Sequence, residues 1–219
     1  MIKKIIITVF YVLSSVYLTE LKAQSFDNQI KKLSDASNDV PLPRSNSSSA
    51  LTPYTTALQQ WKTVADVHSW IKEHFSYDFE RAKQLAENSP TREITGIYSP
   101  EELYQSQKGV CIDLTRFTVE TVNTIDTTKH LQYLMIEFEP IVIDSMIIKK
   151  HWAAIYQEAS GYYIFADSKR PGYMAGPYKN VSDFITEYQG FRARKIVSYR
   201  VLLSYQKKKM SKIMKKINK

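Results

Sequence analysis

Apolar residues in the first half of the chain recur with the spacing of helices. From Thr55 onward they fall at intervals of three and four residues, which predicts one core helix that ends near Phe75. The positions that define its apolar face are Leu58, Trp61, Val64, Val67, Trp70 and Ile71. A shorter helix is expected over residues 79–88, and Pro90 closes it.

A third helix has a clear start signal. Ser99 is a suitable N-cap, Pro100 takes the first helical position, and Glu102 lies three residues after the cap. Together they form a capping box, in which the serine and the glutamate each satisfy a free backbone N–H group. This short helix is expected to run to about Gln107.

Cys111 follows a glycine turn and is the only cysteine of the chain. After Lys108-Gly109 the apolar period resumes over residues 111–125, which predicts a buried helix with Cys111 at or near its N-terminus. A single cysteine cannot form an internal disulfide, so its thiol is free or intermolecular. Chemistry is one reason to keep such a thiol, and burial as a small hydrophobic residue is the alternative.

The second half of the chain is rich in aromatic and β-branched residues, which predicts strands of an antiparallel sheet. These strands are expected at residues 131–138, 152–156, 162–165 and 196–205. Ser160-Gly161 indicates a hairpin turn between two of them, and residues 181–188 form a short helix or a loop insertion. Helices followed by strands indicate an α+β domain with the helices packed on the sheet.

Both ends of the chain differ from this body. Residues 1–23 have the basic start, apolar run and small-residue cleavage site of a secretory signal peptide, and an uncleaved anchor is the alternative. Residues 24–54 are predicted to be a linker or disordered leader, residues 55–206 the single domain, and residues 207–219 a basic tail. We therefore expect an exported monomer, in the periplasm or outside the cell.

Charge is concentrated at the same ends. The formal net charge is +8, but the signal region and the seven lysines of residues 207–219 account for all of it and leave the rest near −1. The domain therefore lacks the basic face of a nucleic-acid-binding fold. Within the tail, Met210, Ile213, Met214 and Ile217 are spaced as on a helix, so weak contact with a membrane or an acidic partner is possible. A disordered, solubilising tail is the alternative.

A nucleophilic thiol needs a base, and the chain offers four histidines. His68 and His74 have no second chemical group at suggestive spacing, and His130 precedes a predicted strand. His151 begins a strand whose hairpin partner ends at Asp167, and a turn at Ser160-Gly161 pairs position 151 with about position 170. A carboxylate at that end of the hairpin can orient the imidazole toward a thiol.

The joint pattern resembles the transglutaminase-like family, which belongs with the papain-like thiol enzymes. The resemblance covers roughly residues 61–188 and is carried by Ser-Pro-Glu-Glu-Leu103, Gly-Val-Cys111, His151-Trp-Ala153 and Tyr-Ile-Phe-Ala-Asp167. It implies a papain-like core with Cys111 as nucleophile, His151 as general acid and base, and Asp167 as the residue that orients His151. Asp113 and Arg116 match polar positions often seen in bacterial members and are expected to serve structural pairing.

Other parts of the site are less defined. Gln105 has the spacing of the glutamine oxyanion donor in papain-like enzymes, while Gln107 and the Cys111 backbone N–H are further candidates. Trp152 and Tyr173 are candidates to line a substrate groove, although sheet packing is the alternative for the tyrosines of this region. No metal site and no cofactor are expected, because the histidines lack ligand spacing and the chain lacks acidic metal loops.

Three functions fit this pattern. The first is hydrolysis of peptide or side-chain amide bonds in a protein or peptide substrate, through an acyl-enzyme. The second is protein crosslinking, in which a lysine amine resolves the same intermediate. The third is a binding or assembly module that uses the scaffold without catalysis.

Overall fold

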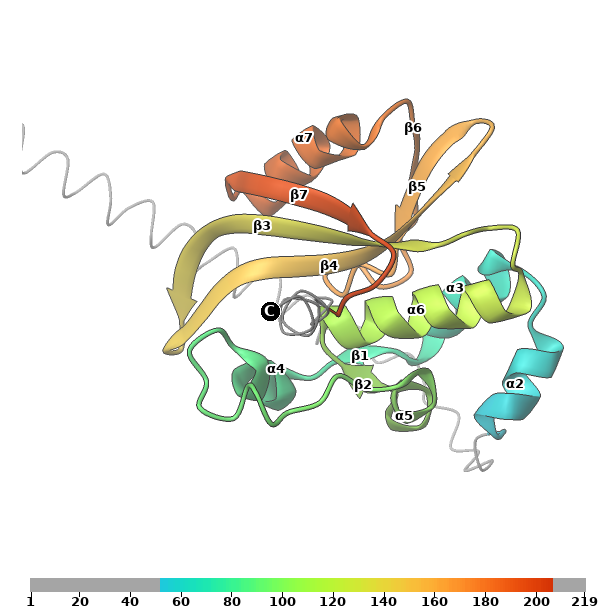
Figure 1. Cartoon of the computed structure of the whole chain (residues 1–219), viewed down its shortest axis with the longest axis horizontal. Coiled ribbons are helices and arrows are strands. Elements are labelled where there is room, and N and C mark those ends of the chain that lie inside the picture. Colours follow the sequence, from blue (N-terminus) through green and yellow to red (C-terminus); the bar gives the residue numbers. More distant parts are fainter. Residues whose placement is uncertain (1–51, 207–219) are drawn as a thin grey trace, which may run out of the picture. The chain divides into compact units, whose positions relative to one another are not determined.

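A computed structural model describes residues 52–206 of the chain, and within them one antiparallel sheet has helices on both faces (Figure 1). This architecture confirms the predicted α+β class. The predicted signal peptide, the basic tail and all but the last residues of the leader lie outside the described range. None of the helices in residues 52–206 is long and apolar enough to cross a membrane.

The helix predicted from Thr55 to Phe75 is in fact two helices, α2 (Tyr54–Gln60) and α3 (Val64–His74). The prediction of one helix was wrong because the apolar spacing continues through the break. Thr63 caps α3 by accepting a hydrogen bond from the Asp66 N–H, and the Asp66 carboxylate accepts one from the Thr63 N–H at 2.8 Å. This second capping box starts a new helix inside the apolar pattern.

Two short strands join the helical layer to the cysteine turn. β1 (Ser76–Tyr77) follows α3, and β2 (Lys108–Gly109) follows α5 (Pro100–Ser106), whose predicted capping box is present. The two strands pair in parallel, with Tyr77 opposite Gly109. A Cβ atom at Gly109 would lie 2.6 Å from the Leu103 side chain, so this close approach requires glycine. α4 (Phe79–Leu85) lies where the short helix of residues 79–88 was predicted.

The helix that starts at the cysteine and the main sheet make up the rest of the fold. α6 (Cys111–Ile125) has the predicted bounds and is largely buried. The sheet order is β6-β5-β4-β3-β7, and every neighbouring pair is antiparallel. Its strands are β3 (Gln132–Ile143), β4 (Met146–Glu158), β5 (Gly161–Phe165), β6 (Ala175–Tyr178) and β7 (Ile196–Leu202). Strand β6 was not predicted.

The β4–β5 hairpin has a register that differs by two residues from the predicted one. Ala154 pairs with Phe165, and Glu158 pairs with Gly161, so the turn consists of Ala159 and Ser160. The glycine of the Ser-Gly signal is the first residue of β5 and has a φ of +136°. The turn was therefore placed one residue too late in the sequence.

The two faces of the sheet bury separate apolar clusters. On one face, side chains such as Tyr133, Ala154 and Phe165 pack with α6, α3 and α5. On the other face, α7 (Val181–Arg192) contributes Phe184 and Tyr188 to a second cluster. The segment predicted as a short helix or a loop is thus a helix that packs on this side of the sheet, as Figure 1 shows.

The β3–β4 hairpin extends beyond the part of the sheet that the helices cover, and its tip is tied back to the helical layer. Asn88, just after α4, donates a side-chain hydrogen bond to the Ser145 carbonyl at 2.7 Å. Its side-chain oxygen accepts one from the Ile147 N–H at 2.9 Å. We call residues 139–150 the hairpin arm. The arm is fixed at the sheet and again at its tip.

Replacement of Gly161 by alanine should destabilise the domain. The new Cβ would lie 2.5 Å from the Tyr178 carbonyl oxygen, and the φ of +136° is unfavourable for alanine. We expect a loss of about 1–3 kcal/mol in the free energy of unfolding, measured by urea denaturation. Gly190→Ala is the matched control, because its Cβ would meet nothing within 4 Å and it lies inside α7, where alanine should add about 0.5–1 kcal/mol. Equal effects in the two variants would contradict this account.

Candidate active site

Cys111 is the first residue of α6, and its thiol lies against strand β4. Burial raises the pKa of the Cys111 thiol to about 11, and a hydrogen bond from the backbone N–H of Trp152 opposes this rise. A helix N-terminus favours a thiolate, but here the loss of hydration has the larger effect. In the resting protein the sulfur is therefore a protonated thiol.

The turn before Cys111 is held by a buried carboxylate. Asp113 is fully buried, and its Oδ2 accepts a hydrogen bond from the Val110 N–H at 3.0 Å. Its Oδ1 accepts a second bond from the Tyr98 N–H at 2.9 Å. Asp113 therefore replaces the side-chain cap that Val110, as the N-cap residue, cannot supply.

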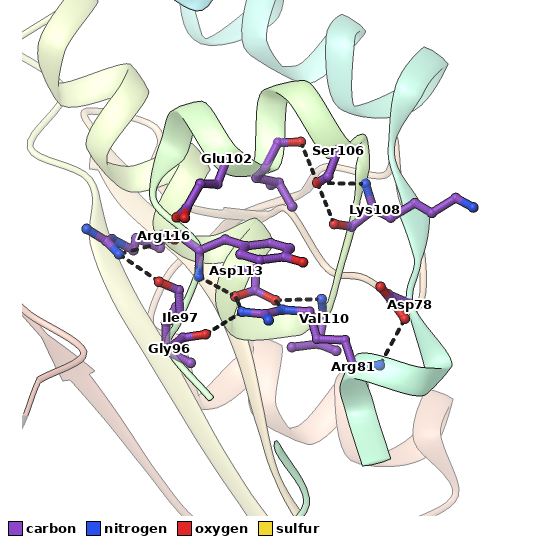
Figure 2. Close-up of polar contacts among 12 residues, drawn as sticks. Asp78, Arg81, Gly96, Ile97, Glu102, Ser106, Lys108, Val110, Asp113 and Arg116 are labelled. Atoms are coloured by element: carbon purple, nitrogen blue, oxygen red, sulfur yellow. Dashed lines mark hydrogen bonds and ion pairs between the residues drawn. The ribbon is translucent and has the colours of Figure 1, made fainter. Parts of the chain in front are cut away.

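Arg81 of α4 balances the charge of this carboxylate. Its Nε and Nη2 atoms donate to the two oxygens of Asp113 at 2.7 and 2.9 Å, which is a bidentate ion pair (Figure 2). Nη2 also donates to the Gly96 carbonyl at 2.6 Å, and the guanidinium lies 3.4 Å from the centre of the Tyr98 ring. No local pattern in the sequence pointed to Arg81, because thirty-two positions separate the two charges.

Arg116 binds the same segment of chain that Arg81 and Asp113 contact. Its Nη1 donates to the carbonyl of Ile97 at 3.0 Å (Figure 2) and to that of Tyr98 at 3.2 Å. Its Nε pairs with Glu120 at 2.9 Å. Asp113 and Arg116 therefore both serve the structural pairing that was predicted for them, although not with each other.

His151 and Asp167 meet at the end of the sheet where β5 stops. The Nε2 atom of His151 lies 2.9 Å from Oδ1 of Asp167, and both residues are less than 5% exposed. Burial lowers the pKa of His151, and the Asp167 charge opposes this. Burial would raise the pKa of Asp167, but the contacts with His151 and the Lys169 N–H hold it far below its usual range. A neutral imidazole beside an ionised carboxylate is the resting state, with Nδ1 free of this bond.

The histidine is adjacent in sequence to the residue that binds the thiol. Trp152 donates its N–H to Cys111, and the charge of Asp167 acts directly on the thiol pKa. The described contacts therefore join His151 to Asp167 and place Cys111 against the backbone of the residue next to His151. Their chemical roles remain a prediction.

Three residues that the sequence did not reveal surround Asp167. The Lys169 N–H donates to Oδ1 at 2.9 Å, and Arg170 Nε donates to Oδ2 at 3.1 Å. The ring of Tyr188, from α7, stacks on His151 with 5.8 Å between ring centres. The only sequence signal was the run Asp-Ser-Lys-Arg170, which resembles an ordinary turn.

A cleft of about 760 Å³ opens beside the thiol. Cys111, Tyr77 and Trp152 line one part of it, and the hairpin arm and the loop after α4 line another. The cleft therefore reaches the cysteine between the sheet and the helical layer.

Comparison with known proteins places this site in a family. A family model described as a transglutaminase-like domain matches residues 48–200. This chain belongs to that family. A search of curated proteins found no match. Among solved structures, calcium-bound LapG of Legionella pneumophila is 15% identical over 76% of this chain and 81% of that chain, with a TM-score of 0.34.

The other predicted site residues of this transglutaminase-like domain lie at different places. The Gln105 amide lies on the exposed side of α5 and donates to Glu101 at 3.3 Å. Gln107 ends α5 with a φ of +53°, and its carbonyl accepts a hydrogen bond from the Ser76 N–H at 2.9 Å. Tyr173 is 44% exposed and stacks with Arg170, and it is not among the residues that line the cleft.

The remaining histidines of the transglutaminase-like domain have other surroundings. The His68 ring packs near Phe165 in the core, and His74 packs on Trp70. His130 is exposed, with a φ of +49°. Among residues 52–206, no group of three or more histidine, cysteine, aspartate or glutamate side chains is arranged to hold a metal ion.

Removal of the Arg81 charge should destabilise the domain strongly. Arg81→Met leaves the buried Asp113 carboxylate without its partner, so we expect a loss of about 3–5 kcal/mol in the free energy of unfolding, measured in urea. Lys83→Met on the same helix is the control, because its pair with Glu80 is exposed and should matter little. A small effect of Arg81→Met would show that water or another cation replaces the guanidinium.

The stability of the domain should depend on pH through His151. The folded-state pKa of His151 lies below the value of about 6.5 in the unfolded chain, so its contribution is complete above pH 6.5 and is lost as the pH falls toward the folded pKa. We expect a slope of up to about 1.4 kcal/mol per pH unit in the free energy of unfolding below pH 6.5. The His151→Gln variant should lack this slope, and the contribution of His68 cancels in the comparison. Parallel pH profiles of the two proteins would contradict the assignment.

Proposed function

We propose that this protein is a thiol hydrolase of amide bonds in peptides or proteins, with Cys111, His151 and Asp167 as its catalytic residues. The observation that carries the proposal is the buried 2.9 Å contact of His151 with Asp167, directly beside the residue whose N–H contacts the thiol. Membership of the transglutaminase-like family supports the same reading. Export to the periplasm or the cell exterior remains a prediction from residues 1–23.

The resting charges suggest how the reaction starts. Because the thiol and the imidazole are both neutral, His151 acts as a general base through Nδ1 and takes the thiol proton as Sγ bonds to the amide carbon. Asp167 stays ionised and stabilises the imidazolium that forms. Arg170 and the Lys169 N–H hold the carboxylate in this orientation.

Collapse of the tetrahedral intermediate completes the first half of the reaction. The carbon–nitrogen bond breaks, the imidazolium gives its proton to the leaving amine, and a thioester remains on Cys111. His151 then takes a proton from water, whose oxygen attacks the thioester carbon. As the carbon–sulfur bond breaks, the imidazolium returns the proton to the sulfur, which releases the acid and restores the thiol. For the oxyanion we assign the Cys111 backbone N–H, because the first N–H groups of a helix have no partner within it.

Alkylation of the purified protein with iodoacetamide should test the thiol and its base. We expect Cys111 to be modified at neutral pH, and His151→Ala should lower the rate at least tenfold, because the buried thiol then lacks a proton acceptor. Intact mass follows the modification, and Cys111→Ser shows that no other group reacts. His74→Ala is the matched control, since its ring packs on Trp70 away from the sheet.

Hydrolysis of a labelled protein mixture should depend on the same two residues, His151 and Cys111. Turnover should fall by about 10²–10⁴-fold in His151→Ala and should be absent in Cys111→Ser. Incorporation of a fluorescent amine in place of cleavage would show that crosslinking is the reaction instead. A thiol that reacts equally in the wild type and in His151→Ala would contradict catalysis and favour a binding module.

A further inference from the structure

The cleft beside Cys111 has an unbalanced charge. Its charged lining consists of four cations and two carboxylates, namely Arg92, Lys149, Lys150, Arg200, Glu87 and Glu137. The rest of the chain between the signal region and the basic tail is close to neutral. The positive charge in the cleft is therefore local, and it lies where a substrate must pass to reach the thiol.

One carboxylate faces three of these cations. Glu87 Oε2 lies 2.6 Å from Arg92 Nη1 and 3.6 Å from Lys149 Nζ, and Glu87 Oε1 lies 3.2 Å from Lys150 Nζ. All four side chains are at most 35% exposed. A single negative charge cannot neutralise three positive charges, so this end of the cleft keeps a partly dehydrated excess of positive charge.

The fourth cation has no acidic partner in residues 52–206. The closest polar contact of the Arg200 guanidinium is the Met135 sulfur, 3.9 Å from Nη2. Glu137 also lines the cleft, but its carboxylate accepts a hydrogen bond from Ser198. Arg200 therefore has donors free for a ligand carboxylate.

We propose that the cleft binds an acidic segment of a peptide substrate, with side-chain carboxylates at Arg200 and at the cations around Glu87. This inference rests on the proposed function, because it names the substrate class of the same site. A peptide fits better than a polyanion such as nucleic acid, because apolar side chains such as Ile112, Met135 and Leu202 line the cleft between the cations. These charges would hold the peptide in the cleft that Cys111 also lines.

Binding of a designed peptide to the full chain tests this inference. The protein carries Cys111→Ala to prevent turnover, and the ligand is a dye-labelled decapeptide with three glutamates or its match with three glutamines. We expect the glutamate peptide to bind at least tenfold more tightly in fluorescence anisotropy at low salt, with the difference shrinking as salt is added. In the double variant Lys149→Gln/Arg200→Gln, the two peptides should bind equally.

Two control variants keep the charge change outside the cleft. Lys179→Gln/Lys195→Gln removes two exposed lysines that do not line the cleft and should leave the preference unchanged. A variant with the seven lysines of residues 207–219 changed to glutamine should also keep it. Loss of the preference in the tail variant but not in the cleft variant would overturn the inference, as would equal binding of both peptides by the parent protein. Displacement of the peptide by short single-stranded DNA at the same concentration as by the unlabelled peptide would also overturn it.

The two proposals can fail separately. An activated thiol together with no preference for the glutamate peptide would leave the hydrolase proposal intact and remove the acidic substrate. A preference that depends on the cleft, together with an unreactive thiol, would remove the hydrolase proposal. It would identify the cleft as a binding site for acidic peptides.

Discussion

The arrangement of this domain depends on one buried ion pair. Asp113 lies in the first turn of α6, and without Arg81 its charge would have no compensation inside the protein. The pair joins α4, the Gly96–Tyr98 segment and the start of α6 through hydrogen bonds that all converge on two side chains (Figure 2). Because Cys111 is the first residue of α6, this charge pair holds the turn that positions the thiol.

The candidate catalytic pair is held by different elements. His151 belongs to the sheet, Asp167 to the loop after β5, and Tyr188 of α7 packs on the histidine from the other side. His151 and Asp167 are buried, and Cys111 is half-buried. Loss of hydration raises the pKa of the thiol and lowers that of the imidazole, which keeps both groups uncharged. Such a site protects its sulfur from oxidation, since oxidants react with the thiolate.

The sequence predicted the parts of the molecule that local signals determine. The capping box at Ser99, the bounds of α6 and the contact between His151 and Asp167 could be read from residue types and spacing. The break between α2 and α3 was missed because a core position, Trp61, lies in the break and continues the apolar period. Arg81 could not be paired with Asp113, because only the tertiary fold brings the two together. The same holds for the cations of the cleft, which come from three separate segments.

The hairpin arm has a consequence for how the size of the cleft can change. The arm is fixed at one end by the sheet and at its tip by the hydrogen bonds of Asn88. The length of the cleft is therefore determined by the number of residues in the arm. The side chains that line the cleft change its shape only locally. Because side chains alternate between the faces of a strand, a lengthened arm keeps its inward-facing residues only if each strand gains two residues, roughly 7 Å. Relatives with the same chemistry could thus differ in substrate length by discrete steps, through insertions far from the thiol.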